Sequence, residues 1–297
     1  RNMLFKEYLR VISELHPRYV VMENVEGFND TKFDNFIGTT GHRYPKNTTA
    51  PTILINEFNL LGYNVLSPRV LDASDYGVPQ KRKRAIFIAY AEGENAPNYP
   101  EPTCSENNKV TVLQAIGDLI TDDKTKNQIN PILTSFQKDS KNGRTPNINK
   151  NPIKCEFIPC NTELSTHQEI IEERFSLFRE EEDGAALKRR IIEQGIDLEG
   201  KTALLNLLSQ KYDLSNEDII NKFKNKEINN DMIETLLTKK NMRKKLNRNK
   251  PSFTVVTLPD DYISPFENRI FSVRELARLQ SFDDSFVFLR KTYYWWR

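Results

Sequence analysis

The amino-acid sequence predicts an α/β fold in which a layered sheet domain carries an inserted, mostly helical domain. Two observations support this prediction. Helix and strand patterns alternate over residues 4–90, whereas almost only helical patterns occur over residues 167–246. The sequence therefore predicts a partial sheet domain over residues 1–120, the inserted domain over 121–250, and a segment over 251–297 that returns to the sheet domain.

The first helix and the first strand follow from the spacing of apolar residues. A strand is expected at Tyr19–Met22, because a short, nearly all-apolar run is typical of a strand buried on both faces of a parallel sheet. Pro17 closes the helix that precedes it. The apolar residues that define one face of this helix recur at spacings of one, three and four, and they are Leu4, Phe5, Tyr8, Leu9, Ile12 and Leu15.

A second helix and two further strands complete the predicted sheet domain. The helix is expected at Thr52–Leu61 and is ended by Gly62. Strands are expected at Asn64–Val70 and Arg84–Tyr90, joined by the turn-rich stretch Asp72–Gln80.

The chain changes character after Gly93. A short helix is expected at Val110–Ile120, and the polar stretch Thr121–Asn151 is expected to be weakly structured. Helices should then form at His167–Glu180, Ala185–Gln194, Thr202–Tyr212, Asn216–Lys226 and Asp231–Leu246.

Strand character returns at Phe253–Leu258, and a last helix is expected at Val273–Leu279. Ser272 is suited to cap this helix, and Glu275 follows three residues later. This is the pattern of a capping box.

Composition argues against several classes of protein. The chain has 297 residues, of which 28% are charged and 38% hydrophobic, which is typical of a globular chain rather than a disordered one. Its net charge of +2 does not by itself indicate a nucleic-acid partner. Cys104, Cys155 and Cys160 form no CxxC pair, which argues against a zinc site or a disulfide framework. No apolar run is long enough to span a bilayer and no leader precedes the first helix, so we expect a cytoplasmic protein. We also expect a monomer without bound metal.

A carboxylate stands at the carboxyl end of the first strand. Glu23-Asn24-Val25 follows Tyr19–Met22 directly, and ligand sites in α/β sheets lie beyond the carboxyl ends of strands. The alternative is a strand-end glutamate that caps a helix or faces water.

A second polar motif, Gln80-Lys81-Arg82-Lys83-Arg84, precedes the strand that begins at Arg84. Side chains alternate along an extended segment, so Gln80, Arg82 and Arg84 should share one face. Guanidinium groups suit phosphate and carbonyl oxygens. The alternative is a solvated basic edge that protects the sheet from aggregation.

These motifs, with two others in order, resemble those of the DNA cytosine-5 methyltransferases. Glu23-Asn24-Val25 resembles the family's ENV motif, and the segment from Asp75 to Arg84 resembles Y-G-x-P-Q-x-R-x-R. Ala115–Leu119 looks like the segment that follows it. Arg274–Phe282 resembles R-E-x-A-R-x-Q-x-F, and Pro251–Val255 matches its usual lead-in.

The resemblance implies a partial Rossmann-like methyltransferase sheet domain with an inserted target-recognition domain. It implies an enzyme of the bacterial restriction-modification type that acts on double-stranded DNA with S-adenosylmethionine as methyl donor. The motif residues near the C-terminal end that it marks as structural are Arg274, Glu275, Arg278 and Gln280.

The same resemblance implies a mechanism. A target cytosine is flipped out of the duplex, a cysteine thiolate adds to C6, a methyl group goes to C5, and the C5 proton leaves. Glu23 would bind the N3 and amine edge, with Asn24 in support. Arg82 and Arg84, supported by Gln80, would meet the O2 oxygen and a nearby phosphate, where negative charge develops. We therefore expect Glu23, Arg82 and Arg84 to converge on one cavity, and Glu23 to contact an arginine where no base is bound.

A basic cluster in the inserted domain is the predicted phosphate-binding surface. Its main residues are Lys240, Arg243, Lys244 and Lys245. Lysine and arginine clusters bind DNA through phosphate contacts and counterion release. The alternative is a solvated helix face.

The sequence departs from the family at the nucleophile. Pro159-Cys160 is the only Pro-Cys dipeptide, and it follows the arginine motif instead of preceding Glu23, so we interpret it as fortuitous. The family's glycine-rich loop and its closing G-N-x-V motif have no match, so no cofactor-binding residues are assigned. We therefore expect a fragment that is inactive alone, and that a complementing N-terminal chain or the other half of a split enzyme would complete.

Two competing functions are a DNA-binding module without catalysis and a metal-dependent nuclease. The basic cluster is the basis for the first. The second depends on Asp260-Asp261 and Asp283-Asp284. Neighbouring residues point in different directions, so neither pair converges on a metal by itself.

Overall fold

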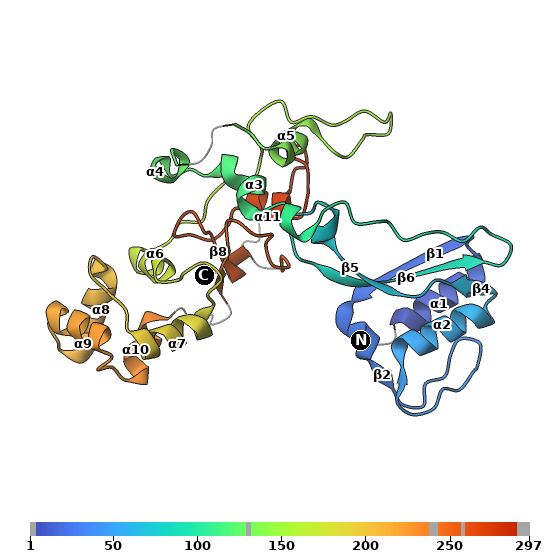
Figure 1. Cartoon of the computed structure of the whole chain (residues 1–297), viewed down its shortest axis with the longest axis horizontal. Helices are drawn as coiled ribbons and strands as arrows, with labels where there is room; N and C mark the ends of the chain where they lie inside the picture. Colours follow the sequence, from blue (N-terminus) through green and yellow to red (C-terminus); the bar gives the residue numbers. More distant parts are fainter. Residues whose placement is uncertain (1–3, 129–131, 238–242, 257–258, 290–297) are drawn as a thin grey trace. The chain divides into compact units, whose positions relative to one another are not determined.

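The computed structural model describes residues 4–128, 132–237, 243–256 and 259–289 (Figure 1). The chain forms two compact units, the first comprising residues 1–76 and 82–107 and the second residues 77–81 and 108–297. The α/β fold class is confirmed. The bounds of the compact units differ from the predicted domain bounds at residues 120 and 250. The assignment of residues 121–250 to target recognition stays a prediction.

The first unit contains two α-helices and a four-stranded sheet among its described residues. The helices are α1 (Leu4–Leu15) and α2 (Ala50–Leu60), and the sheet consists of β1 (Tyr19–Val25), β4 (Tyr63–Val65), β5 (Arg69–Asp72) and β6 (Lys83–Ala91). Shorter elements are the 3₁₀ helices η1 (Glu26–Asp30) and η2 (Ala73–Tyr76) and the strands β2 (Lys32–Phe33) and β3 (Thr48–Thr49).

Strand β6 is the centre of the sheet. It pairs with β1 from Tyr19 opposite Tyr90 to Val25 opposite Arg84. Strands β4 and β5 pair with successive parts of its other edge. All three pairings are antiparallel, so the predicted parallel arrangement is wrong for this sheet. A short apolar run carries no information about the direction of its partner strand.

Burial alternates along β1, which corrects the prediction that this strand is buried on both faces. Val20 and Met22 pack against α1 and α2 in the core of the unit, and Figure 1 shows both helices beside the sheet. Val21 and Val25 point to the opposite face and are 62% and 55% exposed. Among the described residues of this unit, helices cover only one face of the sheet.

The predicted single strand at Asn64–Val70 is two strands, β4 and β5. Pro68 lies between them. Proline has no backbone N–H to donate to a neighbouring strand, so it is excluded from the interior of a sheet. The proline was visible in the sequence, and it marks the division.

The second unit is mostly helical. Its helices are α3 (Val112–Ile116), α4 (Asp123–Lys126), α5 (Ser135–Asn142), α6 (Glu169–Ser176), α7 (Gly184–Gln194), α8 (Thr202–Tyr212), α9 (Asn216–Asn225), α10 (Asn230–Leu236) and α11 (Val273–Leu279). Short elements are η3 (Glu106–Asn108), which crosses the boundary between the units, and η4 (Gly117–Leu119), η5 (Pro259–Asp261), β7 (Lys244–Lys245) and β8 (Tyr262–Ile263).

Three predictions for this unit need correction. Helices α4 and α5 form within the stretch Thr121–Asn151 that was expected to be weakly structured. Helix α10 ends at Leu236 instead of continuing to Leu246, and residues 238–242 lie outside the described parts. Of the strand expected at Phe253–Leu258, residues 253–256 form no strand and residues 257–258 lie outside the described parts; the preceding Ser252 forms an isolated bridge with Gln80.

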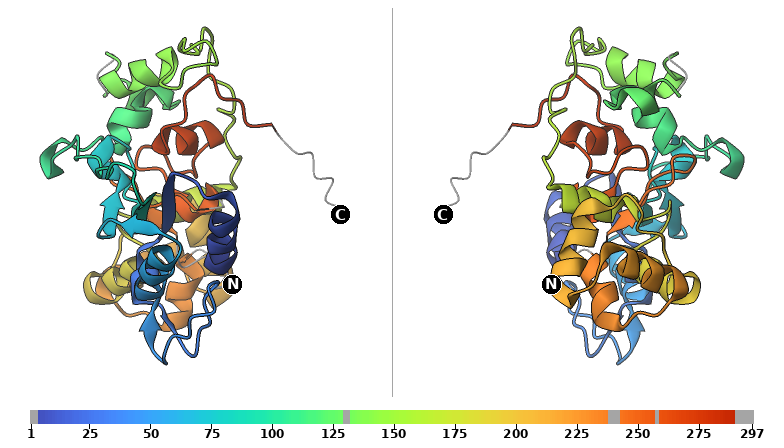
Figure 2. Two further views of the ribbon diagram at one scale, coloured as in Figure 1. Left: turned by 90° about the vertical axis from the view of Figure 1, so that its right-hand side faces the viewer. Right: turned by 90° about the vertical axis from the view of Figure 1, so that its left-hand side faces the viewer.

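Two hydrophobic clusters organise the second unit. One packs together the five helices from α6 through α10, which form the yellow-to-orange group of helices in Figure 2. The other packs α3 against α11 through Ile116 and Leu279. The predicted capping box of α11 is confirmed, since Ser272 and Glu275 each accept a backbone hydrogen bond from the other. No helix in the described ranges is long and apolar enough to cross a membrane.

A buried carboxylate fastens a loop to α2 in the first unit. Glu57 is fully buried and accepts hydrogen bonds from the backbone and hydroxyl groups of Thr39 and Thr40 and, at 2.7 Å, from the hydroxyl of Tyr44. A Cβ atom on Gly38 would lie 2.0 Å from Oε1 of Glu57, so glycine is required there. Burial acts to raise the pKa of Glu57, but these hydrogen bonds outweigh burial and hold the pKa below its usual value.

We expect Glu57→Gln to lower the free energy of unfolding by about 1–3 kcal/mol at neutral pH, because the donors around it lose a charged acceptor. A lowered pKa stabilises the folded state above the ordinary carboxyl pKa, and that stability is lost as the pH falls through the folded value. The difference between wild type and variant should therefore shrink in acid. Urea unfolding at pH 7 and in acid measures it. Glu92→Gln, at an exposed site, is the control, and an equal effect there would contradict the prediction.

Candidate functional site

Glu23 and Arg84 meet on one face of the sheet in the first unit. Glu23 on β1 lies opposite Ile86 on β6, two residues from Arg84, so the two side chains leave the sheet on the same face. Nε of Arg84 is 2.6 Å from Oε1 of Glu23. The Glu23 side chain is 53% exposed and that of Arg84 19% exposed. The predicted contact between Glu23 and an arginine of the second motif is confirmed, whereas a cavity shared by Glu23, Arg82 and Arg84 stays a prediction.

The end of β1 determines where this pair lies. Asn24 Oδ1 accepts a hydrogen bond from the N–H of Val25 at 2.9 Å, at the point where η1 begins. Arg84 donates to the carbonyl of Lys83 at 2.7 Å, which holds its guanidinium close to the strand. The side chain of Asn24 therefore serves the local backbone, while Glu23 keeps part of its surface open to a ligand.

Arg82 lies one residue before β6, and its backbone is fixed by the end of β5. Its N–H donates to Asp72 Oδ1 at 3.0 Å, and its carbonyl accepts from the N–H of Ala73. Its side chain is half-buried. It belongs to the same unit as Glu23 and Arg84.

Gln80 does not share the face predicted for Arg82 and Arg84. Strand β6 begins at Lys83, and residues 77–81 belong to the second unit. Gln80 is buried there, and its Nε2 donates to the carbonyl of Leu279 at 3.3 Å. Gln80 lies outside the strand, so the alternation of side chains along an extended segment does not place it on the face of Arg84.

In the second unit, α11 carries buried charges from the last motif. Arg278 is fully buried and donates two hydrogen bonds to Asp284, at 2.8 and 2.7 Å. It also contacts Asp118, after α3. Glu275 forms a two-point ion pair with Arg269, at 2.8 Å for each contact.

Arg274 on the same helix binds backbone carbonyls. It donates to the carbonyl of Cys160 at 3.0 Å and to that of Asp283 at 2.9 Å, and it also contacts the carbonyl of Phe286. Arg274 therefore ties two loops that are distant in sequence to one helix. Gln280, the fourth residue of the motif, donates to the carbonyl of Leu276 and borders a cavity.

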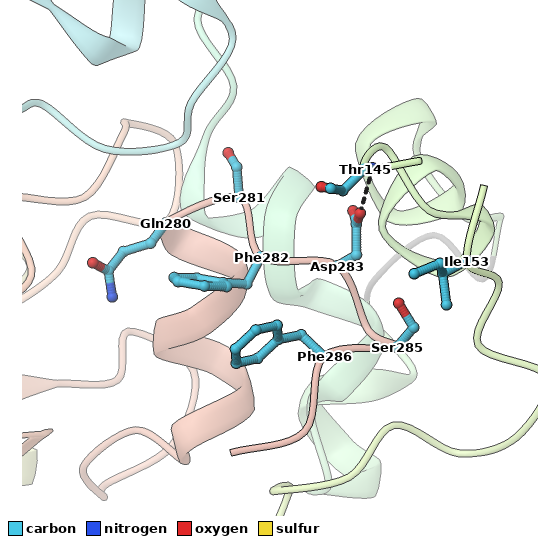
Figure 3. A pocket seen from close by; sticks show the side chains of 8 residues that line it. All are labelled: Thr145, Ile153, Gln280, Ser281, Phe282, Asp283, Ser285 and Phe286. Carbon is cyan, nitrogen blue, oxygen red and sulfur yellow. Dashed lines mark hydrogen bonds between the residues drawn. The ribbon is translucent and has the colours of Figure 1, made fainter. Parts of the chain in front are cut away.

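This cavity lies beside the C-terminal end of α11 and has a volume of 440 Å³. Figure 3 shows Phe282 and Phe286 on one side and Thr145 and Ile153 on the other, with Asp283 bonded to the backbone of Thr145. The sequence did not indicate this cavity, because its walls come from segments that are far apart in the chain.

The described residues of the basic cluster contact other residues of the second unit. Lys240 lies outside the described residues. Arg243 pairs with Asp260 at 3.2 Å, and the ammonium of Lys244 lies 4.0 Å from the ring centroid of Phe253. Burial lowers the pKa of Lys245. These contacts favour a structural role, and phosphate binding by this cluster stays a prediction.

Asp283 and Asp284, which a nuclease would need as metal ligands, are already used as acceptors. Asp283 accepts from the guanidinium and the backbone N–H of Arg144, and Asp284 from Arg278. Their role as partners of arginines was not predicted. The signal in the sequence was weak: two acids that follow the last motif closely.

Comparisons with known proteins agree with the resemblance that the motifs indicate. The family model described as C-5 cytosine-specific DNA methylase matches residues 1–293. The type II methyltransferase M.DdeI of Desulfomicrobium norvegicum is 27% identical over 98% of this chain and 59% of its own length. The type II methyltransferase M.XorII of Xanthomonas oryzae pv. oryzae is 40% identical over 40% of this chain and 24% of its own length.

A solved structure, of a putative DNA modification methyltransferase encoded within a prophage (E. coli), resembles this chain in fold. It matches 97% of this chain and 65% of that chain, with a TM-score of 0.50 and 20% identity. The chain therefore spans less than two thirds of the length of these three proteins.

We expect Asp284→Asn to lower the free energy of unfolding by up to about 3–5 kcal/mol, because the buried Arg278 would lose one of its two charged partners and keep only Asp118. Urea unfolding measures the change. Glu14→Gln is the matched control: Glu14 pairs with Arg10 at 2.6 Å, but that pair is exposed and contributes little to stability. Equal losses in the two variants would show that burial of the ion pair is not important.

Proposed function

The chain belongs to the C-5 cytosine-specific DNA methylase family, and on this premise we propose that it supplies the base-activating residues and the target-recognition part of a type II DNA methyltransferase. The complete enzyme would methylate C5 of a flipped cytosine within a specific DNA sequence, as part of a restriction-modification system. The observation that carries the proposal is the Glu23–Arg84 pair, which joins two of the family motifs at the sheet.

Glu23 would bind the cytosine on its N3 and amine edge. Addition of a thiolate to C6 pushes negative charge toward N3 and O2 of the ring. A carboxyl group at N3 and a guanidinium at O2 stabilise that charge where it develops, and because both are fixed beforehand they lower the barrier to addition. Arg84 would take the O2 position, and Arg82 would meet a nearby phosphate.

The exposure of Glu23 supports a ligand role over a purely structural one. Its side chain is 53% exposed although it is paired with Arg84, and exposed ion pairs contribute little to stability. A flipped base could therefore replace the contact with Arg84 at small expense to the fold. The two side chains would then hold opposite parts of one ring.

S-adenosylmethionine would supply the methyl group when bound, as the family implies. None of the residues described above is assigned to hold it. The thiol that adds to C6 also has no counterpart in the motif order of this chain. Both functions would come from a complementing N-terminal segment or chain.

The outer edge of β1 supports such a complementing part. Among the described residues β1 pairs along one edge only, and Val21 and Val25 are exposed on the face that no helix covers. An unpaired edge strand with exposed apolar side chains promotes aggregation unless another element covers it. We propose that the complementing part covers this strand.

The purified 297-residue chain is expected to transfer no measurable methyl group to DNA of mixed sequence, because loss of a nucleophile lowers rates by several powers of ten. A radiolabelled-methyl assay measures incorporation, and Cys160→Ala is tested in parallel. Incorporation that persists in Cys160→Ala would contradict the account of the missing nucleophile. Incorporation that disappears in this variant would identify Cys160 as the nucleophile.

In an enzyme completed with its N-terminal part, we expect Glu23→Gln to lower kcat by about 100-fold or more, with a much smaller change in DNA affinity. The reason is that Glu23 acts on charge that develops only after the base is bound. The matched control is Glu26→Gln, because Glu26 is similarly exposed and pairs with Lys83 at 3.7 Å. If Glu23→Gln methylates as fast as Glu26→Gln, Glu23 is a structural residue only.

A further inference from the structure

Large apolar side chains protrude from the loop between α5 and α6. Ile148 is 98% exposed, and the neighbours Phe157 and Ile158 are each 85% exposed. Large apolar side chains are rarely exposed to this extent in a folded protein, and clusters of them mark interaction sites. In Figure 1 the yellow-green loop that follows α5 extends beyond the helix. We call residues 144–161 the apolar loop.

The base of the apolar loop is anchored to its own unit. The backbone N–H groups of Arg144 and Thr145 donate to Asp283 Oδ2 at 2.7 and 2.8 Å, and Thr145 and Asp283 are seen together in Figure 3. At the other end, the carbonyl of Cys160 accepts from Arg274. Both ends of the loop are therefore fixed beside α11.

The loop is also braced internally. The backbone N–H of Asn147 donates to the carbonyl of Asn151 at 2.8 Å, and the side-chain oxygen of Asn147 accepts from the N–H groups of Asn149 and Asn151. Nearer to Phe157, the N–H of Cys155 donates to the carbonyl of Lys141 at 2.8 Å. The protruding side chains are thus presented by a braced backbone, which reduces the entropy lost on binding.

The charge of the apolar loop suits a polyanion. Glu156 is its single acidic residue, while Arg144, Lys150 and Lys154 are basic. Both lysines are exposed. Exposed lysines are depleted in protein–protein interfaces, whereas they bind the phosphates of DNA. The asparagines at its turn add hydrogen-bonding groups of the kind that contact phosphates and base edges.

We propose that the apolar loop is a DNA-insertion element, in which Phe157 and Ile158 enter the base stack while Lys150 and Lys154 hold the flanking phosphates. This inference rests on the proposed action on duplex DNA. A cytosine that leaves the duplex leaves a gap, and apolar side chains that fill such a gap stabilise the distorted DNA. Phe157 and Ile158 are therefore positioning residues, since they act on the duplex and not on the reacting ring.

The inference is tested with the full chain and two fluorescent duplexes of identical mixed sequence, one intact and one with a single abasic site. The abasic duplex already contains the gap, so we expect about tenfold tighter binding to it, measured by anisotropy. Phe157→Ser with Ile158→Ser should bring the ratio of the two affinities close to one. Leu15→Ser is the control, because Leu15 is 74% exposed on α1 in the other unit.

A second pair of substitutions tests the phosphate contacts separately. Lys150→Ala with Lys154→Ala should weaken binding to both duplexes equally and reduce the slope of log K against log salt by about two. The insertion role alone would be overturned if the Phe157→Ser and Ile158→Ser variant kept the wild-type preference for the abasic duplex. It would also be overturned if Leu15→Ser lost that preference. A chain that binds neither duplex would overturn the insertion role and also the proposed target-recognition function.

Discussion

The burial of Arg278 is the constraint on which the second unit depends. A fully buried guanidinium is tolerated only when ionic partners and acceptors surround it, and here Asp118 and Asp284 provide them. These two acids lie far apart in sequence, on either side of the helices α5 to α10. By binding both acids, Arg278 holds together the segment before the helical part and the segment that follows α11. The neighbouring Arg274 and Glu275 extend this buried polar network to two further loops, which contain Cys160 and Arg269.

The pair in the first unit is of a different kind. Glu23 and Arg84 are also in direct contact, but Glu23 is half-exposed and its surroundings leave it accessible. A buried pair stabilises its unit and cannot easily exchange partners, whereas an exposed pair contributes little to stability and can. The chain therefore uses similar chemistry for two purposes. At α11 the charges hold the fold together, and on the sheet Glu23 stays half-exposed, as its proposed role in binding a base requires.

The anchoring of the apolar loop connects the structural motif to the proposed DNA-insertion element. Asp283 follows the motif helix and accepts from the backbone of Arg144 and Thr145 at the base of the loop. Arg274 holds Cys160 at its other end. A motif whose residues are buried would thereby determine how an exposed element is presented to DNA. Under this proposal, residues that touch no ligand would influence DNA binding through the loop that they anchor.

The sequence by itself determined the local structure and the motifs. Spacing of apolar residues and capping patterns predicted α1, α8 and α11 with their observed bounds, since these signals depend on neighbours within one or two helical turns. It also predicted that Glu23 and an arginine would meet. Only the tertiary structure decided that the strands are antiparallel, that one face of β1 is uncovered, and that Arg243 is held by Asp260. Strand direction, burial and ion-pair partners depend on segments that are distant in the chain, and no local pattern specifies them.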